Sequence, residues 1–203
     1  HLLDGSQLKL RQETNYPWDG AVKLTIEACK AAPFEIKLRI PGWAKGGMLQ
    51  VNGQNAVVEI RPGTFASIQR TWKAGDVITL DLPMEIYLVE GHARIEEVRN
   101  QVAVKRGPVV YCVESPDLPS DAKITDVYLR GNTPLSVEHR AEFLGGLSVI
   151  SGEVLLRTDR ETAMYRSVSQ PQWKTHPVTF VPYFAWSNRG AAEMTVFLPV
   201  LWS

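Results

Sequence analysis

Strict alternation of polar and apolar residues constrains this chain more than any other feature. Every second residue is apolar in Val22–Ala28, and the same pattern recurs in Phe34–Ile40. Successive side chains of a β-strand point to opposite faces, so each segment predicts a strand with one buried and one solvated face. Asn52-Gly53 lies between two such strands and is a pair that tight hairpins favour. Similar strands are predicted at 7–14, 66–72, 77–82 and 86–89.

The pattern of polar and apolar residues changes after Pro83. Val102–Val113 is almost continuously apolar, apart from Lys105–Pro108, which predicts a strand that bends at a bulge and is covered on both faces. No helix of useful length is predicted, and 160–167 could form a turn or two at most. Further strands are predicted at 124–129, 136–138, 147–150, 153–156, 179–184 and 193–199, with loops at 115–122 and 169–176.

Strands of this length, with turns about every ten residues, are typical of antiparallel sandwiches. We therefore expect an all-β protein of two antiparallel β-sandwiches, jelly-roll or immunoglobulin-like, without substantial helix. The change at Pro83 places the second sandwich at residues 83–190. Because Glu193–Pro199 alternates again, residues 1–82 plus 191–203 are expected to form the first sandwich, with the second inserted before the last strand.

Charge and hydropathy bear on the classes of partner. The chain of 203 residues has 22 Lys plus Arg and 22 Asp plus Glu, so no net charge draws it to nucleic acid or anionic lipid. No apolar stretch reaches the roughly 20 residues that span a bilayer. We expect neither a nucleic-acid nor a membrane partner. The N-terminus has no secretory pattern, which favours a cytoplasmic over a secreted location.

The cysteines and histidines are scattered. Cys29 and Cys112 lie beside strand-like segments, and we expect two buried free thiols, with a disulfide as the alternative. The histidines show no metal-ligand spacing, so no metal site is expected; they are His1, His92, His139 and His176.

Six ordered blocks of the sequence resemble the C-terminal part of the β-L-arabinofuranosidases of glycoside hydrolase family 127. The blocks are Gln12–Gly20, Leu38–Trp43, Val51–Gly53, Trp72–Met84, Val102–Tyr111 and Pro182–Gly190. The resemblance implies a bacterial protein of carbohydrate metabolism, in which an (α/α) barrel with a zinc-bound cysteine nucleophile and a glutamate precedes two β-sandwich domains. This chain resembles the sandwich part, beginning just after the barrel.

The resemblance also implies that the catalytic residues lie upstream of the Tyr16–Gly20 block. Neither Cys29 nor Cys112 matches the nucleophile segment, and the adjacent Glu96 and Glu97 would point to opposite faces of a strand, which suits a solvated acidic edge rather than a catalytic pair. No activity and no cofactor are therefore expected in this chain, and zinc only in the missing catalytic domain of a parent glycoside hydrolase. The implied partner is the upstream barrel of the same polypeptide, and a homodimer stays open.

Polar and aromatic residues at two turns are candidates for contact with substrate or with the barrel. They are Tyr16, Trp18, Asp19, Trp186, Asn188 and Arg189. Aromatic faces can stack on sugar rings, although tryptophans such as Trp43 can equally plug the end of a sandwich. Asp19 and the Asn188-Arg189 pair can also serve only to stabilise turns. A corner with two large aromatics around a proline is expected to expose an apolar surface, through which the isolated chain could associate.

Three functions of different classes remain at this stage. The first is a non-catalytic support of the barrel, and the second is a carbohydrate-binding module, which an exposed coplanar pair of aromatics would favour. The third is an immunoglobulin-like interaction domain, which the cysteine spacing without a core tryptophan pattern disfavours. We rank them in this order.

Overall fold

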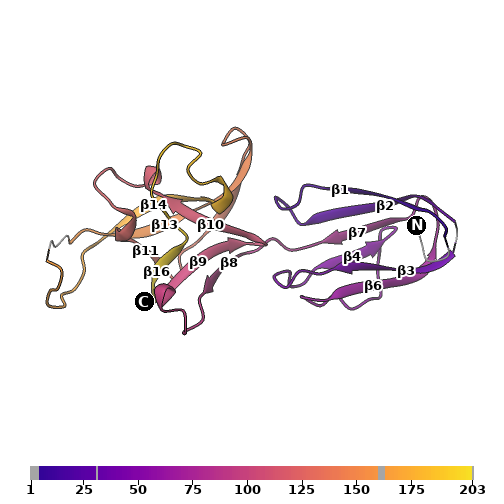
Figure 1. Cartoon of the computed structure of the whole chain (residues 1–203), viewed down its shortest axis with the longest axis horizontal. Helices are drawn as coiled ribbons and strands as arrows, with labels where there is room; N and C mark the ends of the chain where they lie inside the picture. The colour runs from indigo at the N-terminus through magenta and orange to yellow at the C-terminus, as the bar shows by residue number, and fades with distance from the viewer. Residues whose placement is uncertain (1–4, 31, 160–162, 203) are drawn as a thin grey trace. The chain divides into compact units, whose positions relative to one another are not determined.

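The computed structural model describes residues 5–30, 32–159 and 163–202. The chain divides into two compact units, residues 1–85 and 86–203, and each is described by itself (Figure 1). In the described ranges every regular element is a β-strand or a single turn of 3-10 helix, which confirms the all-β prediction. No helix among these residues is long and apolar enough to cross a membrane.

The first unit consists of two sheets. A five-stranded sheet has the order β1-β2-β7-β4-β5, and β3 pairs with β6 in a second sheet. Its elements are β1 (Leu8–Thr14), β2 (Ala21–Cys29), β3 (Ala32–Arg39), β4 (Met48–Val51), β5 (Gln54–Asn55), β6 (Phe65–Trp72) and β7 (Val77–Asp81). The predicted alternating segments thus became strands within one or two residues of the expected bounds.

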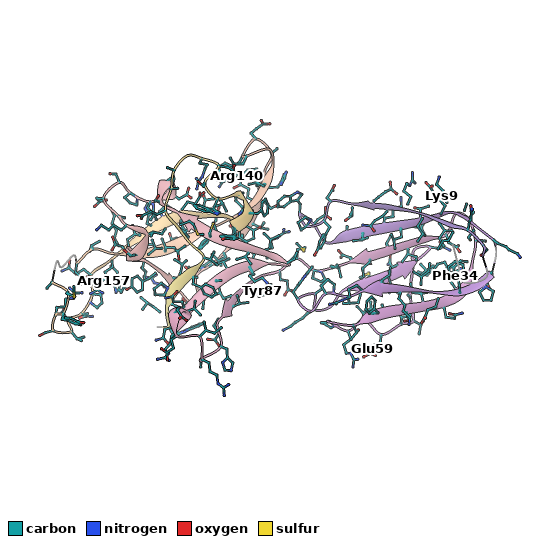
Figure 2. The ribbon with its side chains drawn as sticks, in the orientation of Figure 1. Lys9, Phe34, Glu59, Tyr87, Arg140 and Arg157 are labelled. Atoms are coloured by element: carbon teal, nitrogen blue, oxygen red, sulfur yellow. The ribbon has the colours of Figure 1, made fainter. Side chains whose placement is uncertain are left out.

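Apolar residues from both sheets form one core in the first unit. Ile26 of β2, Ile36 of β3 and Ile78 of β7 belong to the same buried cluster, because alternation turns their side chains inward. Trp72 at the end of β6 is fully buried, and its Nε1–H donates to the Phe34 carbonyl at 2.9 Å. Figure 2 shows the position of Phe34 in this unit. The two sheets are therefore layers around a shared core.

A buried carboxylate ties two turns of the first unit together. Asp76 is 1% exposed, and its oxygens accept hydrogen bonds from Asn52 Nδ2 at 2.9 Å and from the Lys73 N–H at 3.0 Å. Asn52 and Gly53 have positive φ, as expected of the predicted hairpin turn, and Asn52 Oδ1 accepts the Val77 N–H. The β4–β5 turn and the β6–β7 turn thus hold each other in place.

The second unit contains a closed ring of strands. Its strands are β8 (Ile86–Glu90), β9 (Gln101–Arg106), β10 (Val109–Glu114), β11 (Val127–Arg130), β12 (Ser136–Arg140), β13 (Leu147–Arg157), β14 (Trp173–Pro182), β15 (Met194–Thr195) and β16 (Phe197–Leu201). Its 3-10 turns are η1 (Glu96–Val98), η2 (Ser115–Asp117), η3 (Ile124–Asp126) and η4 (Tyr183–Ala185). The order β10-β14-β13-β11-β16-β9 closes because β9 also pairs with β10.

This ring is a β-barrel, so the expectation of a second sandwich was wrong. Closure leaves none of the ring strands with a free edge, which a sandwich cannot achieve. The interior is filled by side chains such as Val113, Leu129 and Phe180. One pair in the ring, β11 with β16, is parallel. Period-two alternation could not indicate the closure, because it reports which face of a strand is buried but not which strand lies beside it.

The last strand corrects the expected domain boundaries. β16 pairs with β9 and β11, and β15 pairs with β10, so both lie in the second unit rather than in the first. The first unit therefore does not include residues 191–203, and the boundary falls after Glu85 rather than Leu82. Alternation in this segment correctly predicted a strand, but it could not identify the pairing partner.

Several local predictions in the second unit also change. Residues 102–113 do not form one bent strand: Gly107 adopts φ 53° and Arg106 pairs with Val109, which makes a tight hairpin. Residues 147–157 form one strand instead of two, and β14 begins at Trp173, inside the predicted loop 169–176. The turn expected at 160–167 lies partly outside the described residues, and residues 163–167 are not helical.

Both cysteines are free thiols, as predicted, although only Cys112 is buried and Cys29 is partly exposed.

We predict that Asp76→Asn destabilises the first unit by about 1–3 kcal/mol, because the new amide turns a donor toward Asn52 or Lys73. Burial alone would raise the pKa of the Asp76 carboxyl, but hydrogen bonds from Asn52 and Lys73 hold that pKa below its ordinary value. A lowered pKa means that the ionised group stabilises the fold above about pH 4 and that this contribution is lost on further acidification. Thermal unfolding of wild type and variant should therefore differ most near neutral pH.

The exposed Asp81→Asn is the control for this prediction and should change the midpoint little. A stability difference between wild type and Asp76→Asn that stays constant from neutral pH to pH values below the ordinary carboxyl pKa would contradict it.

Candidate functional site

Three of the predicted site residues lie in the corner between β1 and β2. Asp19 Oδ1 accepts the Ala21 N–H at 3.0 Å, and Asp19 Oδ2 accepts a hydrogen bond from Asn15 Nδ2 at 3.3 Å. The Trp18 N–H donates to the Asn15 carbonyl. Asp19 therefore stabilises its own turn, which was one of the two interpretations that the sequence left open.

Gly20 is required at this corner by a close approach of the backbone. Its carbonyl accepts the Leu82 N–H at 3.0 Å, and a Cβ at this position would lie 1.7 Å from the Leu82 carbonyl oxygen. Any larger residue would push the corner away from the end of β7. The close approach fixes where the aromatic residues before it emerge.

The aromatic side chains of the corner are partly exposed. The Tyr16 ring is 41% exposed and stacks on Trp43, with ring centroids 6.4 Å apart and planes 21° from parallel. Burial raises the pKa of the Tyr16 hydroxyl, against the opposing effect of a hydrogen bond with Trp43. Trp18 is half-buried. A hollow of about 400 Å³ adjoins the ring and is lined by Tyr16, Thr14, Pro41 and apolar strand residues.

The other three predicted residues lie in the second unit, after β14. Asn188 Nδ2 donates to the Ala185 carbonyl at 3.0 Å, so this amide closes a turn. Ser187 adopts a positive φ of 65°, which is uncommon for a residue other than glycine. Its N–H donates to Glu114 Oε1 at 2.8 Å. A buried carboxylate therefore holds this unusual backbone conformation.

Arg189 binds two carboxylates at once. Its Nε donates to Glu114 Oε2 at 3.0 Å, while Nη1 donates to Asp117 Oδ1 at 2.8 Å and Nη2 contacts both acids. Glu114 is 0% exposed. The hydrogen bonds that Arg189 donates to Asp117 and Glu114 raise the pKa of its guanidinium, against the effect of burial. We call Arg189, Glu114 and Asp117 the arginine clamp.

The arginine clamp has the chemistry of a structural anchor. Glycoside hydrolysis uses one carboxylic acid and one carboxylate, both facing the bond that breaks. The oxygens of both clamp acids instead accept hydrogen bonds from a guanidinium, so they are not free to face a substrate bond. The clamp attaches the segment after β14 to the end of β10.

Among the described residues, neither Cys112 nor the pair Glu96 and Glu97 has the setting of a nucleophile. Burial, aided by the nearby Glu114, raises the pKa of the Cys112 thiol to about 12, and the thiol contacts the Val181 carbonyl. Glu96 and Glu97 lie in η1 and are exposed, although on a 3-10 turn and not on a strand. No group of three or more metal-ligating side chains occurs within residues 5–30, 32–159 and 163–202. These donors do not fit a zinc site.

Sequence reasoning missed several residues of these surfaces. The clamp acids were not singled out, although a single acid at the end of the apolar run 109–113 is a signal for a buried, paired charge. Tyr183 and Phe184 were assigned to a strand, but they lie in η4 and are 45% and 61% exposed, next to Trp186 at 37%. The predicted residues thus form two groups, one within each unit.

Comparison with known proteins identifies the family. Residues 2–84 match the model described as "Beta-L-arabinofuranosidase, GH127 middle domain", and residues 86–199 match "Glycoside hydrolase family 127 C-terminal domain". The chain belongs to glycoside hydrolase family 127. The boundary between the two matches coincides with the boundary between the two structural units.

The relatives are longer than this chain. It is 35% identical over 205 residues to a "Non-reducing end beta-L-arabinofuranosidase" of Bifidobacterium longum subsp. longum, covering 95% of this chain and 30% of that protein. A solved structure titled "Glycoside hydrolase" is 39% identical with a TM-score of 0.89, covering 98% of this chain and 33% of that one. A GH127 β-L-arabinofuranosidase from Geobacillus stearothermophilus T6 is 34% identical with a TM-score of 0.88, covering 98% and 31%. The chain thus spans about a third of the length of these relatives.

We predict that Arg189→Met destabilises the second unit by about 3–5 kcal/mol, because it leaves the fully buried Glu114 carboxylate without its guanidinium partner. Adding Glu114→Gln should restore part of this loss of stability. Urea unfolding of the single and double variants gives the free energy of interaction between Arg189 and Glu114. Arg140→Met is the matched control, since Arg140 pairs at the surface with Glu138 and should contribute less than about 1 kcal/mol. Figure 2 labels Arg140. Equal losses in Arg189→Met and Arg140→Met would contradict the prediction.

Proposed function

We propose that these two units are the non-catalytic β part of a β-L-arabinofuranosidase-like enzyme and that they support its catalytic barrel. The observation that carries the proposal is the pair of family matches, to a middle and to a C-terminal domain, in a chain that covers about a third of its relatives. In this proposal the layered first unit is a β-sandwich, and the barrel partner belongs to the same polypeptide.

Both candidate groups serve as contact surfaces in this proposal. At the first corner Asp19 fixes the turn, so the partly exposed Tyr16 side chain is available for contact. In the second unit the arginine clamp and Asn188 hold the segment that carries Trp186. Partly exposed aromatic side chains on preorganised turns are typical anchors of domain interfaces.

The alternative, a carbohydrate-binding module, lacks support from the aromatic geometry. Sugar platforms present ring faces to the ligand, whereas the near-parallel rings of Tyr16 and Trp43 stack on each other. Zinc and the cysteine nucleophile belong, in our proposal, to the catalytic part.

We predict that this chain alone does not hydrolyse an aryl β-L-arabinofuranoside and does not bind stoichiometric zinc. The reason is that the Cys112 thiol is buried and protonated and that its neighbours are not arranged as ligands. Activity assays and metal analysis of the purified chain test this prediction, with Cys112→Ser as the comparison. Hydrolysis by the wild-type chain that Cys112→Ser abolishes would show that the chain is itself catalytic.

A chimera tests the supporting role directly. This chain replaces the matching segment of the Bifidobacterium longum protein, and hydrolysis is compared with that of the same protein lacking the segment. We predict activity in the chimera and its loss in the truncated protein. Tyr16→Ser with Trp18→Ser should lower the chimera's activity or its thermal midpoint, on the order of tenfold in activity if the rings are interface anchors.

Met164→Ser is the control in the chimera, since Met164 is 89% exposed but lies outside both candidate groups. An inactive chimera would contradict the supporting role. An active chimera in which the two corner substitutions behave like the control would instead exclude the corner as the contact surface.

A further inference from the structure

Asn52 and Gly53 form the only Asn-Gly pair in the sequence. Asparagine is a chemically labile residue in proteins. The Asn-Gly sequence is its most reactive context, because glycine has no Cβ to hinder the approach of its backbone nitrogen to the asparagine side chain. Both residues are exposed at the turn between β4 and β5, and a Cβ at Gly53 would have no neighbour within 4 Å among the described residues. The pair is therefore open to water.

The reaction at an Asn-Gly pair has two steps, and water is the only co-reactant. The Gly53 backbone nitrogen loses its proton and attacks the side-chain carbonyl carbon of Asn52, which closes a five-membered succinimide ring and releases ammonia. Water then opens the ring at either carbonyl and leaves aspartate or isoaspartate at position 52. For the first step, the side-chain carbonyl carbon must turn toward Gly53, and the amide nitrogen must be free to leave.

Hydrogen bonds at both polar atoms of the Asn52 amide oppose that movement. Nδ2 donates to Asp76 Oδ1 at 2.9 Å, and Oδ1 accepts the Val77 N–H at 2.8 Å. The backbone N–H of Asn52 also donates to the Val77 carbonyl at 2.8 Å. The amide is thus bound to the β6–β7 turn, and it can reach Gly53 only after both side-chain hydrogen bonds have broken.

The bond to Asp76 is the stronger of the two side-chain bonds, because its acceptor is a carboxylate. Asp76 is 1% exposed, and its other oxygen accepts the Lys73 N–H at 3.0 Å, so the carboxylate is itself held in place. Asp76 therefore anchors the Asn52 amide in its unreactive position.

Deamidation of Asn52 would turn this attraction into repulsion. Aspartate at position 52 has no side-chain N–H to donate, and it sets a second carboxylate against the buried Asp76. Isoaspartate also adds one carbon to the backbone of a two-residue turn. In either case the β4–β5 turn and the β6–β7 turn lose the bond that connects them, and refolding does not restore it.

We infer that Asn52 is a modification site of this protein, at which the hydrogen bond to Asp76 suppresses deamidation in the folded state. Local opening of the turn frees the amide, so the chemical lifetime of Asn52 depends on the local stability of the first unit. The inference does not rest on the proposed catalytic partner, because the Asn-Gly pair and all of these bonds lie within one unit.

Asp76→Asn tests the role of the anchor in the whole chain. The amide has nearly the shape of the carboxylate but no charge, so the bond to Asn52 weakens. Ile36→Val is the control, because it loosens the same core without removing a hydrogen bond of Asn52. The folded proteins are incubated at mildly alkaline pH, and peptide mass spectrometry follows the change from amide to acid at Asn52. Wild type unfolded in guanidinium chloride gives the unprotected rate, and circular dichroism checks folding.

We expect Asn52 to react on the order of tenfold or more slowly in the folded wild type than in the unfolded chain. Asp76→Asn should recover much of this difference, while Ile36→Val should stay close to the wild type. Equal rates in the folded and unfolded wild type overturn the inference. So does a rate in Asp76→Asn that is no higher than in Ile36→Val.

A double variant tests the consequence of the modification. N52D introduces the aspartate product beside Asp76. In N52D/D76N the two groups are exchanged, so the new amide at position 76 can donate to the carboxylate at position 52 and still accept the Lys73 N–H. We expect N52D to lower the thermal midpoint and the double variant to regain part of the loss. A double variant no more stable than N52D overturns the proposed repulsion between the two carboxylates.

Discussion

A sheet with one apolar face must have that face covered, and each unit of this chain covers it in a different way. In the first unit the five-stranded sheet is covered by the β3–β6 pair, and both sheets contribute to one core around Trp72. The covering layer is narrow, so β6 ends it with an open edge. In the second unit six strands form a closed ring that encloses its own core, and closure makes a second layer unnecessary there; they are β9, β10, β11, β13, β14 and β16.

The sequence predicted the first unit well because local information suffices there. Its strands alternate strictly, and turns such as Asn52-Gly53 have residues that adopt positive φ. The second unit depends on pairings between distant segments, such as β11 with β16, that leave no periodic signal. The run 102–113 is a clear case: its composition predicts burial, but only the conformation of Gly107 distinguishes a hairpin from one bent strand.

Prediction of the candidate residues from the sequence was limited in the same way, because it could use only partners that lie nearby in the chain. The role of Asp19 in its turn could be predicted, because its hydrogen-bond partners lie within four residues. The acid partners of Arg189 lie 75 and 72 residues away in the sequence, so no spacing rule connects them. The exposure of Tyr183 and Phe184 was not predicted, for a different reason. Aromatic residues are common in strands, so an aromatic segment after a strand is usually interpreted as its continuation.

The buried acids of both units are used for structure. Asp76 connects two turns of the first unit, and Glu114 holds both Arg189 and the strained backbone at Ser187. A catalytic acid needs a proton that it can give to the leaving-group oxygen, and a catalytic carboxylate needs a face open to the sugar. Asp76 and Glu114 meet neither requirement, because backbone N–H groups, an amide and a guanidinium already bind their oxygens. This use of charge agrees with our proposal that the chemistry of the enzyme belongs to another part of the polypeptide, which these two units position.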